Sequence, residues 1–118
     1  MATPNIASIA TLTGVTIAGA ATDSATNVID VATDHTYKVN TIIIANIDGT
    51  NSANITLEIS VDNGSNYYAF AKTIAVPADS SLSILDSPLY LDETDLLRVT
   101  AAVNGDLTYV ISYEDIVD

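Results

Sequence analysis

The sequence predicts an all-β protein, an antiparallel β-sandwich or jelly-roll-like single domain with an N-terminal arm. The first observation behind this is the alternation in residues 53–61, which is typical of a half-buried strand and of no helix. The second is that turn-forming residues recur at intervals of roughly ten residues. The third is length, since a chain of 118 residues that is 48% hydrophobic is enough for one core without disulfides. The alternating apolar positions of that strand are Ile55, Leu57, Ile59 and Val61.

Residues 1–23 are the least patterned part of the chain, with apolar side chains spread among Ala, Thr and Ser. Two interpretations stay open: an extended arm that docks on a neighbouring subunit, and the first strand of the sandwich itself. We expect a short strand near residues 14–18 in either case, followed by the sandwich domain at 24–118. If the segment is an arm, its anchors are Ile6, Ile9 and Leu12.

Residues 37–49 form the run around which the rest is arranged. Ile42 and Ile44 fall on one face, while the other face is also apolar, with Ile43, Ala45 and Ile47. A strand that is apolar on both faces is covered on both faces. We expect a second sheet on one side and the arm or a sister subunit on the other, and Ile42 and Ile44 are therefore interface candidates.

Turn residues then predict how the strands connect. Residues 48–52 read Asp-Gly-Thr-Asn-Ser and predict a hairpin between 37–49 and 53–61. Asn104-Gly105 predicts another hairpin, between strands at 95–103 and 107–113, because both central residues of such a turn need positive φ.

The remaining segments predict further strands. A short one at 25–32 precedes the central run, and short ones near Leu82 and Leu89 follow Pro77. A strand at 67–76 carries one apolar face, made of Tyr68, Phe70, Ile74 and Val76. The side chains predicted to be buried in the core are Ile55, Leu57, Ile59, Leu97, Val99, Leu107, Tyr109 and Ile111.

Charge limits the partners. Three Lys and Arg residues oppose 15 Asp and Glu residues, which gives a formal net charge of -12. Phosphate backbones and anionic membrane surfaces repel such a chain, so we expect neither nucleic acid nor a membrane as a partner. No apolar run approaches the length that spans a bilayer.

No group of residues in the sequence has the pattern of a catalytic or metal-binding site, and we predict no enzyme, catalytic residue, metal site or cofactor. His35 is the single histidine, so a serine nucleophile has only that base available. The acidic turns at 48–51, 62–66 and 92–95 are predicted to be ordinary β-turns, with a bound calcium ion as the alternative. Tyr67 and Tyr90 are the aromatic residues left for a sugar-stacking surface.

Several phrases resemble a group of small β-sandwich virion structural proteins of tailed phages, marine and cyanobacterial ones especially. These phrases lie at 37–49, 71–80, 89–93, 97–101 and 112–116. The resemblance covers about two-thirds of the chain, mostly at core and turn positions. It implies a β-sandwich fold and a virion role, and it transfers no catalytic residue.

We therefore expect a phage virion structural protein, first of all a capsid decoration (cement) protein on the outer shell. A neck or tail protein and a glycan-binding surface module are the alternatives. The implied partners are the major capsid protein or other virion proteins, together with further copies of the chain as a dimer or trimer. An outer station suits the acidic charge, which would oppose packaged DNA inside the capsid.

Overall fold

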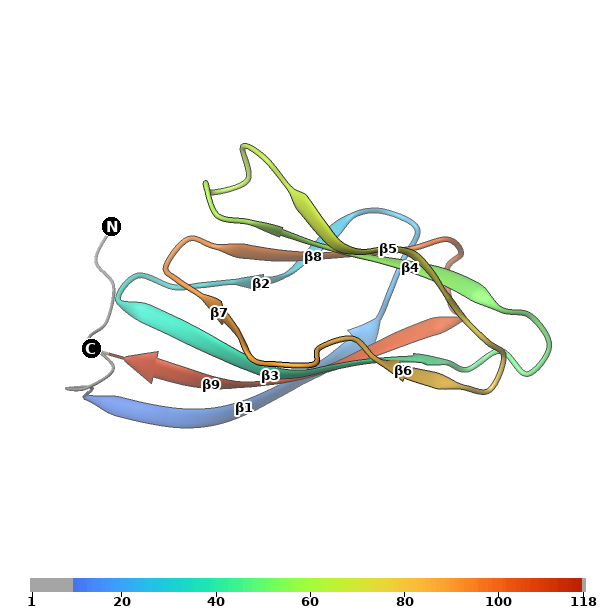
Figure 1. Ribbon diagram of the computed structural model, residues 1–118, viewed down its shortest axis with the longest axis horizontal. Helices are drawn as coiled ribbons and strands as arrows, with labels where there is room; N and C mark the ends of the chain where they lie inside the picture. Colours follow the sequence, from blue (N-terminus) through green and yellow to red (C-terminus); the bar gives the residue numbers. More distant parts are fainter. Residues whose placement is uncertain (1–9, 118) are drawn as a thin grey trace.

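The computed structural model describes residues 10–117, which form two antiparallel sheets facing each other (Figure 1). These described residues contain strands and turns but no helix, so the all-β prediction is confirmed. The strands are β1 (Thr11–Ala20), β2 (Thr26–Asp30), β3 (His35–Asn46), β4 (Ala53–Ser60), β5 (Tyr68–Val76), β6 (Ser81–Ser83), β7 (Leu89–Leu91), β8 (Leu96–Ala101) and β9 (Leu107–Val117).

The strand order is that of a jelly roll. One sheet, sheet A, runs β1-β9-β3-β6, with β7 also paired to β3, and the other, sheet B, runs β2-β8-β4-β5. If β6 and β7 count as one interrupted strand, the first strand pairs with the last, the second with the next to last, and so inward to β4 and β5. This nesting is a long antiparallel ribbon wrapped into two sheets.

The core lies between the two inner faces. Ile42 and Ile111 are directly opposite each other in sheet A, and both are fully buried. Ile55 and Leu57 of sheet B are also fully buried. Six of the eight predicted core side chains are buried, namely Ile55, Leu57, Leu97, Val99, Leu107 and Ile111. Ile59 and Tyr109 are only partly buried against this core.

Both predicted hairpins are wrong. β3 belongs to sheet A and β4 to sheet B, so residues 47–52 carry the chain from one sheet to the other. Likewise β8 lies in sheet B and β9 in sheet A, with Gly105 at φ 87° in the connection. The apolar faces of consecutive strands thus meet across the core rather than side by side. The sequential hairpin that does form joins β4 to β5.

The predicted apolar face of residues 67–76 is wrong for three of its four members and correct for Val76. Tyr68 is 60%, Phe70 38% and Ile74 40% exposed, whereas Ala71 and Val76 are buried. The pairing of β5 with β4 shifts register twice near Leu57, and Thr73 adopts φ 48°. Each bulge reverses the alternation of side chains, so a simple period of two does not hold along this strand.

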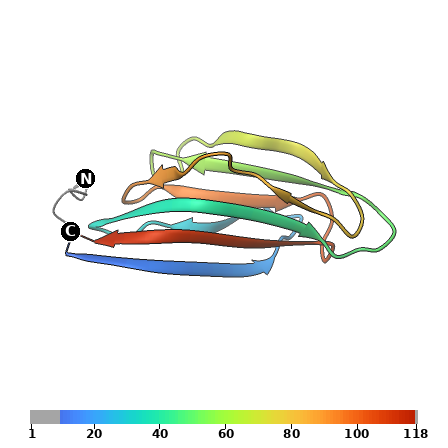
Figure 2. The same cartoon turned by 60° about the horizontal axis from the view of Figure 1, so that its bottom comes forward.

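Most of the described part of the segment at 1–23 is a strand of the sandwich. Thr11–Ala20 forms β1, which pairs with β9 over its whole length at the border of sheet A (Figure 2). Gly19 leaves room for the Tyr109 side chain of the facing strand, since a Cβ there would lie 2.7 Å from the Tyr109 hydroxyl oxygen. Ile6 and Ile9, predicted as anchors, lie outside the described residues.

Candidate interaction surfaces

The outer face of sheet A is almost without charge. Because Ile17, Ile111 and Ile42 point into the core, their neighbours along each strand point outward. Three rows run across β1, β9 and β3: Thr16, Ser112 and Thr41; Ala18, Val110 and Ile43; Ala20, Thr108 and Ala45. We call these nine residues the neutral face. The hydroxyl oxygens of Thr16 and Ser112 lie 2.9 Å apart and tie two of its strands together.

Charge on sheet A appears in the next row, where Lys38 stands directly opposite Glu114. Asn40 Nδ2 also donates a long 3.5 Å hydrogen bond to Glu114 Oε1. Opposite charges side by side on one sheet face offset each other, so the row of Lys38 and Glu114 adds little net charge next to the neutral face.

Most acidic residues lie instead in the connections between strands. Those in turns are Asp23, Asp34, Asp48, Asp62, Asp79, Asp86, Asp92, Glu93, Asp95 and Asp106. In the jelly roll most of these turns lie at the two ends of the sandwich. The negative charge is therefore concentrated at these ends, and the neutral face contains none of it.

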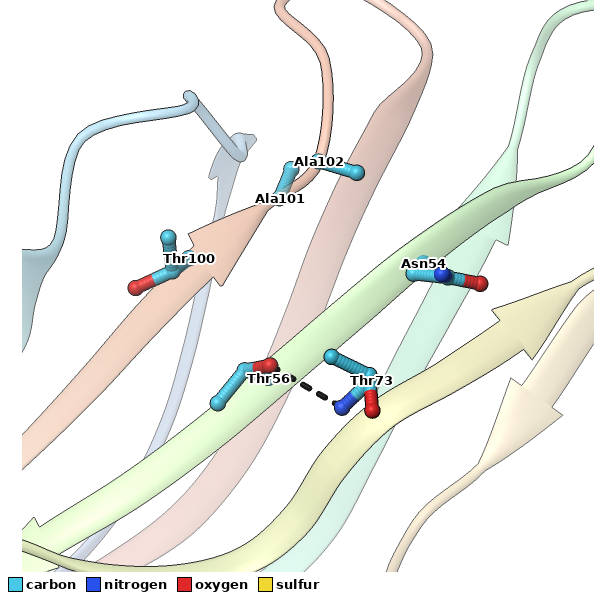
Figure 3. A pocket seen from close by; sticks show the side chains of 6 residues that line it. All are labelled: Asn54, Thr56, Thr73, Thr100, Ala101 and Ala102. Atoms are coloured by element: carbon cyan, nitrogen blue, oxygen red, sulfur yellow. Dashed lines mark hydrogen bonds between the residues drawn. The ribbon is translucent and has the colours of Figure 1, made fainter.

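The outer face of sheet B has a shallow depression of about 210 Å³. It is lined by Asn54, Thr56, Thr73, Thr100, Ala101 and Ala102 (Figure 3). The Thr73 backbone N–H donates to Thr56 Oγ1 over 3.0 Å, where β5 bulges away from β4. Hydroxyls, methyls and one amide line this depression, so it offers no acid, base or nucleophile pair for catalysis.

Beside this depression, an ion pair crosses sheet B. Arg98 Nη2 lies 2.9 Å from Glu58 Oε1, and the guanidinium stands 3.5 Å from the ring centroid of Tyr67. Tyr67 in turn donates its hydroxyl hydrogen to Asn27 Oδ1 over 3.1 Å. Tyr67 is thus held by the protein itself, which leaves Tyr90, on the other sheet, as the exposed member of the predicted sugar-stacking pair.

His35 is engaged in a cluster at one end of sheet A. Its Nδ1 lies 2.6 Å from Asp115 Oδ1, and its ring meets Tyr37 edge-on at 6.1 Å. Tyr37 stacks on Tyr113 with centroids 4.5 Å apart. Burial first, and then nearby charged groups including Asp115, raises the pKa of both tyrosines above the usual value. Both phenols therefore stay neutral and complete the packing.

The acidic turns are built on hydrogen bonds to their own backbone. Asp48 Oδ1 accepts the N–H of Thr50 at 2.8 Å, and this bond, followed by that from the Asn51 side chain, lowers the pKa of Asp48. At the third turn, Asp95 Oδ2 accepts the N–H of Asp92 at 2.8 Å. Within residues 10–117, no three His, Asp or Glu side chains are grouped so that they would hold a metal ion.

The sequence-based interface candidates separate in the structure. Ile42 and Ile44 are 0% exposed in the core, so they cannot contact another subunit, and their prediction is wrong. The outward residue between them is Ile43, on the neutral face. Leu12 is 55% exposed on β1. Sequence reasoning missed the neutral face, although the absence of charge from residues 11–22 and 107–113 was a usable signal.

Comparisons with known proteins give the fold. No protein-family model matches the sequence, and no curated protein matches it. A structure of Bacillus endospore appendages, described as a novel family of disulfide-linked pili, has a TM-score of 0.52 and 16% identity over 92% of this chain and 88% of its own. A structure of the T13 IBDV viral particle has a TM-score of 0.53 and 8% identity over 93% of this chain and 32% of its own.

A pentameric capsid protein from metagenomic phage sequences also superposes, with a TM-score of 0.44 and 15% identity over 86% of this chain and 61% of its own. The chain spans about a third of the IBDV chain and most of the pilus protein. At these identities the first two matches show a shared all-β fold.

Among the described residues, no helix is long and apolar enough to cross a membrane.

Proposed function

We propose that this chain is a structural protein of a phage virion that decorates the outside of the capsid and reinforces the shell. The observation that carries the proposal is the neutral face on a chain of net charge -12. Burying ionised groups against a partner is costly, and this face allows contact without burying any. The acidic ends would then project beside the contact.

The charge favours an outer station. Copies facing the capsid lumen would each oppose the packaged DNA, whereas on the outside the same charge keeps particles apart in solution. A symmetric lattice repeats every contact, so each copy needs only a modest interface with the major capsid protein.

The fold supports an assembly role by analogy. The two similar structures with the higher TM-scores come from a viral particle and from pili, both built from protein subunits. We further propose that the protein is not an enzyme, because the depression on sheet B holds no titratable group and His35, the single histidine of the chain, lies on the other sheet.

Binding to particles that lack the protein tests the proposal. Val110→Asp, in the middle of the neutral face, should abolish binding, whereas Thr100→Asp on the outer face of sheet B should leave it intact. Val110 is 38% exposed, so the substitution leaves the core unchanged. Equal binding by both variants would exclude the neutral face as the contact.

Copy number separates the stations on the virion. Quantitative mass spectrometry of purified particles should find on the order of hundreds of copies if the protein decorates the capsid. A dozen or fewer would move it to the neck or tail and end the decoration proposal.

A glycan-binding surface is the second candidate, favoured by the exposed rings of Tyr68 and Phe70 two residues apart on β5. Exposed aromatic rings stack on the apolar faces of sugars. A glycan array with the native protein and with Tyr68→Ala tests this: binding that the substitution removes would support it, and no binding would dismiss it.

A further inference from the structure

Three of the four sheet borders are protected against pairing with another strand. β2 has five residues, a register irregularity and a terminal Asp30. β5 bulges twice and carries Lys72. β6 and β7 have three residues each, with Asp86 and Pro88 between them. Short strands, bulges, charges and prolines are the devices by which soluble proteins block unwanted edge pairing.

β1, the fourth border, has none of these devices. It has ten residues and keeps an unbroken register with β9 from Thr11 to Ala20. Residues 10–22 include no charged residue and no proline. Its other side pairs with no strand that the structure describes, and Figure 2 shows it as the outermost strand of sheet A. Such a border is a template for a further strand.

The direction of its free backbone groups follows from the ladder. Ala21 N donates to Leu107 O, and Ile47 N donates to Asp106 O, so odd-numbered residues of β9 bond toward β1 and even-numbered ones toward β3. Antiparallel bonding alternates in this way along each strand. The even-numbered residues of β1 therefore direct their N–H and C=O groups to the open side: Leu12, Gly14, Thr16, Ala18 and Ala20.

We propose that β1 pairs antiparallel with β1 of a second copy of this chain, across a two-fold axis near Thr16. In this register Thr16 faces its own equivalent, Gly14 faces Ala18, and Leu12 faces Ala20. The two sheets A then form one continuous sheet. Because the axis is perpendicular to the sheet, both neutral faces lie on the same side of the dimer.

Two features favour a second copy over a foreign strand. First, a two-fold contact uses the same open border on both subunits, so the dimer keeps only the protected borders, whereas an added foreign strand would present a new open one. Second, β1 brings no like charges together, although each copy carries a net charge of -12.

Amide hydrogen exchange read residue by residue by NMR tests the contact. In a concentrated sample, the amides of Gly14, Thr16 and Ala18 should be protected along with those of Val15 and Ile17. On dilution to the monomer, confirmed by sedimentation velocity, the even-numbered amides should lose protection while the odd-numbered ones keep it. A protein that stays monomeric at millimolar concentration would overturn the proposal. So would a dimer with freely exchanging even-numbered amides.

Matched variants complete the test. Thr16→Lys places two like charges opposite each other and should raise the dissociation constant about tenfold or more. Thr16→Pro removes an outward N–H that the monomer does not use, so it should give a folded monomer. Ala75→Lys, on the protected border β5, is the control and should leave dimerisation unchanged. Protection of the even-numbered amides only when another virion protein is added would make a foreign strand the occupant and overturn the self-pairing.

Discussion

The side-chain amide of Asn46 in sheet A donates a 2.9 Å hydrogen bond to the backbone carbonyl of Val76 in sheet B, thirty residues along the chain. The same Nδ2 also donates to the carbonyl of Asn51 at 2.9 Å, and Oδ1 accepts the N–H of Asp48. Asn46 is 3% exposed. One buried amide thus holds the corner where the chain crosses between the sheets.

Replacing this amide should destabilise the fold. Asn46→Ala leaves the Val76 carbonyl buried without its donor, and an unsatisfied buried group costs about 1–3 kcal/mol. Urea denaturation followed by circular dichroism should show a midpoint lowered to match. Asn54→Ala, an exposed residue of β4, is the control, and an equal, small effect of both would mean that the corner is held by other contacts.

Leu57→Ala should lower the free energy of unfolding by about 2–5 kcal/mol, from lost burial and the cavity left behind. Leu57 is 0% exposed in the centre of sheet B, whereas Ile47 is 62% exposed. Ile47→Ala should therefore change stability by no more than about 0.5 kcal/mol. A denaturant midpoint that Leu57→Ala leaves unchanged would place this side chain outside the core.

Ile42→Asp should prevent folding, because it places an unpaired carboxylate among fully buried apolar side chains. Thr56→Asp should be tolerated, since its carboxylate can accept the Thr73 N–H that the Thr56 hydroxyl accepts now. Soluble yield, circular dichroism and a thermal melt compare the two variants. A folded Ile42→Asp protein with a near-native melt would contradict the packing described for β3.

Lowering the pH should remove the contribution of Asp62 to the stability of the fold. Hydrogen bonds from the Asn66 side chain, then from the Asn66 backbone and the Ser60 hydroxyl, hold the pKa of Asp62 below its usual value. A carboxyl whose pKa is lowered by folding stabilises the protein above its unfolded pKa, about 4, and loses that effect as pH falls through the folded pKa. Asp62→Asn should therefore melt below the native protein at pH 7.

The same comparison at successively lower pH should show the difference between Asp62→Asn and the native protein shrink below the usual carboxyl pKa and vanish once Asp62 is protonated. Asp86→Asn, in the connection between β6 and β7, is the control and should track the native melt throughout. A gap that persists unchanged at low pH would mean that the substitution acts through geometry rather than through the charge.

The effect of Asp95 on stability should change with pH in the opposite direction. Burial raises its pKa above the usual value, against the lowering by the Asp92 N–H. A raised carboxyl pKa means that stability falls as pH rises through that folded pKa. Asp95→Asn keeps an acceptor for the Asp92 N–H without the buried charge, so its melting temperature at pH 7 should equal or exceed the native one. A marked drop at pH 7 would show that the charge itself stabilises the turn.

The sequence by itself determined the strands and most of the core. The alternation at Ile55 and Leu57, and again at Leu107 and Ile111, is a local property, because side chains of a strand point to opposite faces wherever it pairs. Charge is likewise a property of the residues themselves, and the stretches around Thr16 and Val110 contain no ionisable acid or base of the Asp, Glu, Lys or Arg type.

The tertiary structure decided the pairing. Turn residues such as 48–52 and 104–105 reverse the chain equally well within one sheet or between two, so they carry no information about the partner strand. Which partner a strand takes depends on contacts distant in sequence, such as the Asn46 bond to Val76. Those contacts buried Ile42, exposed Phe70 through the bulges of β5, and left β1 as the open border.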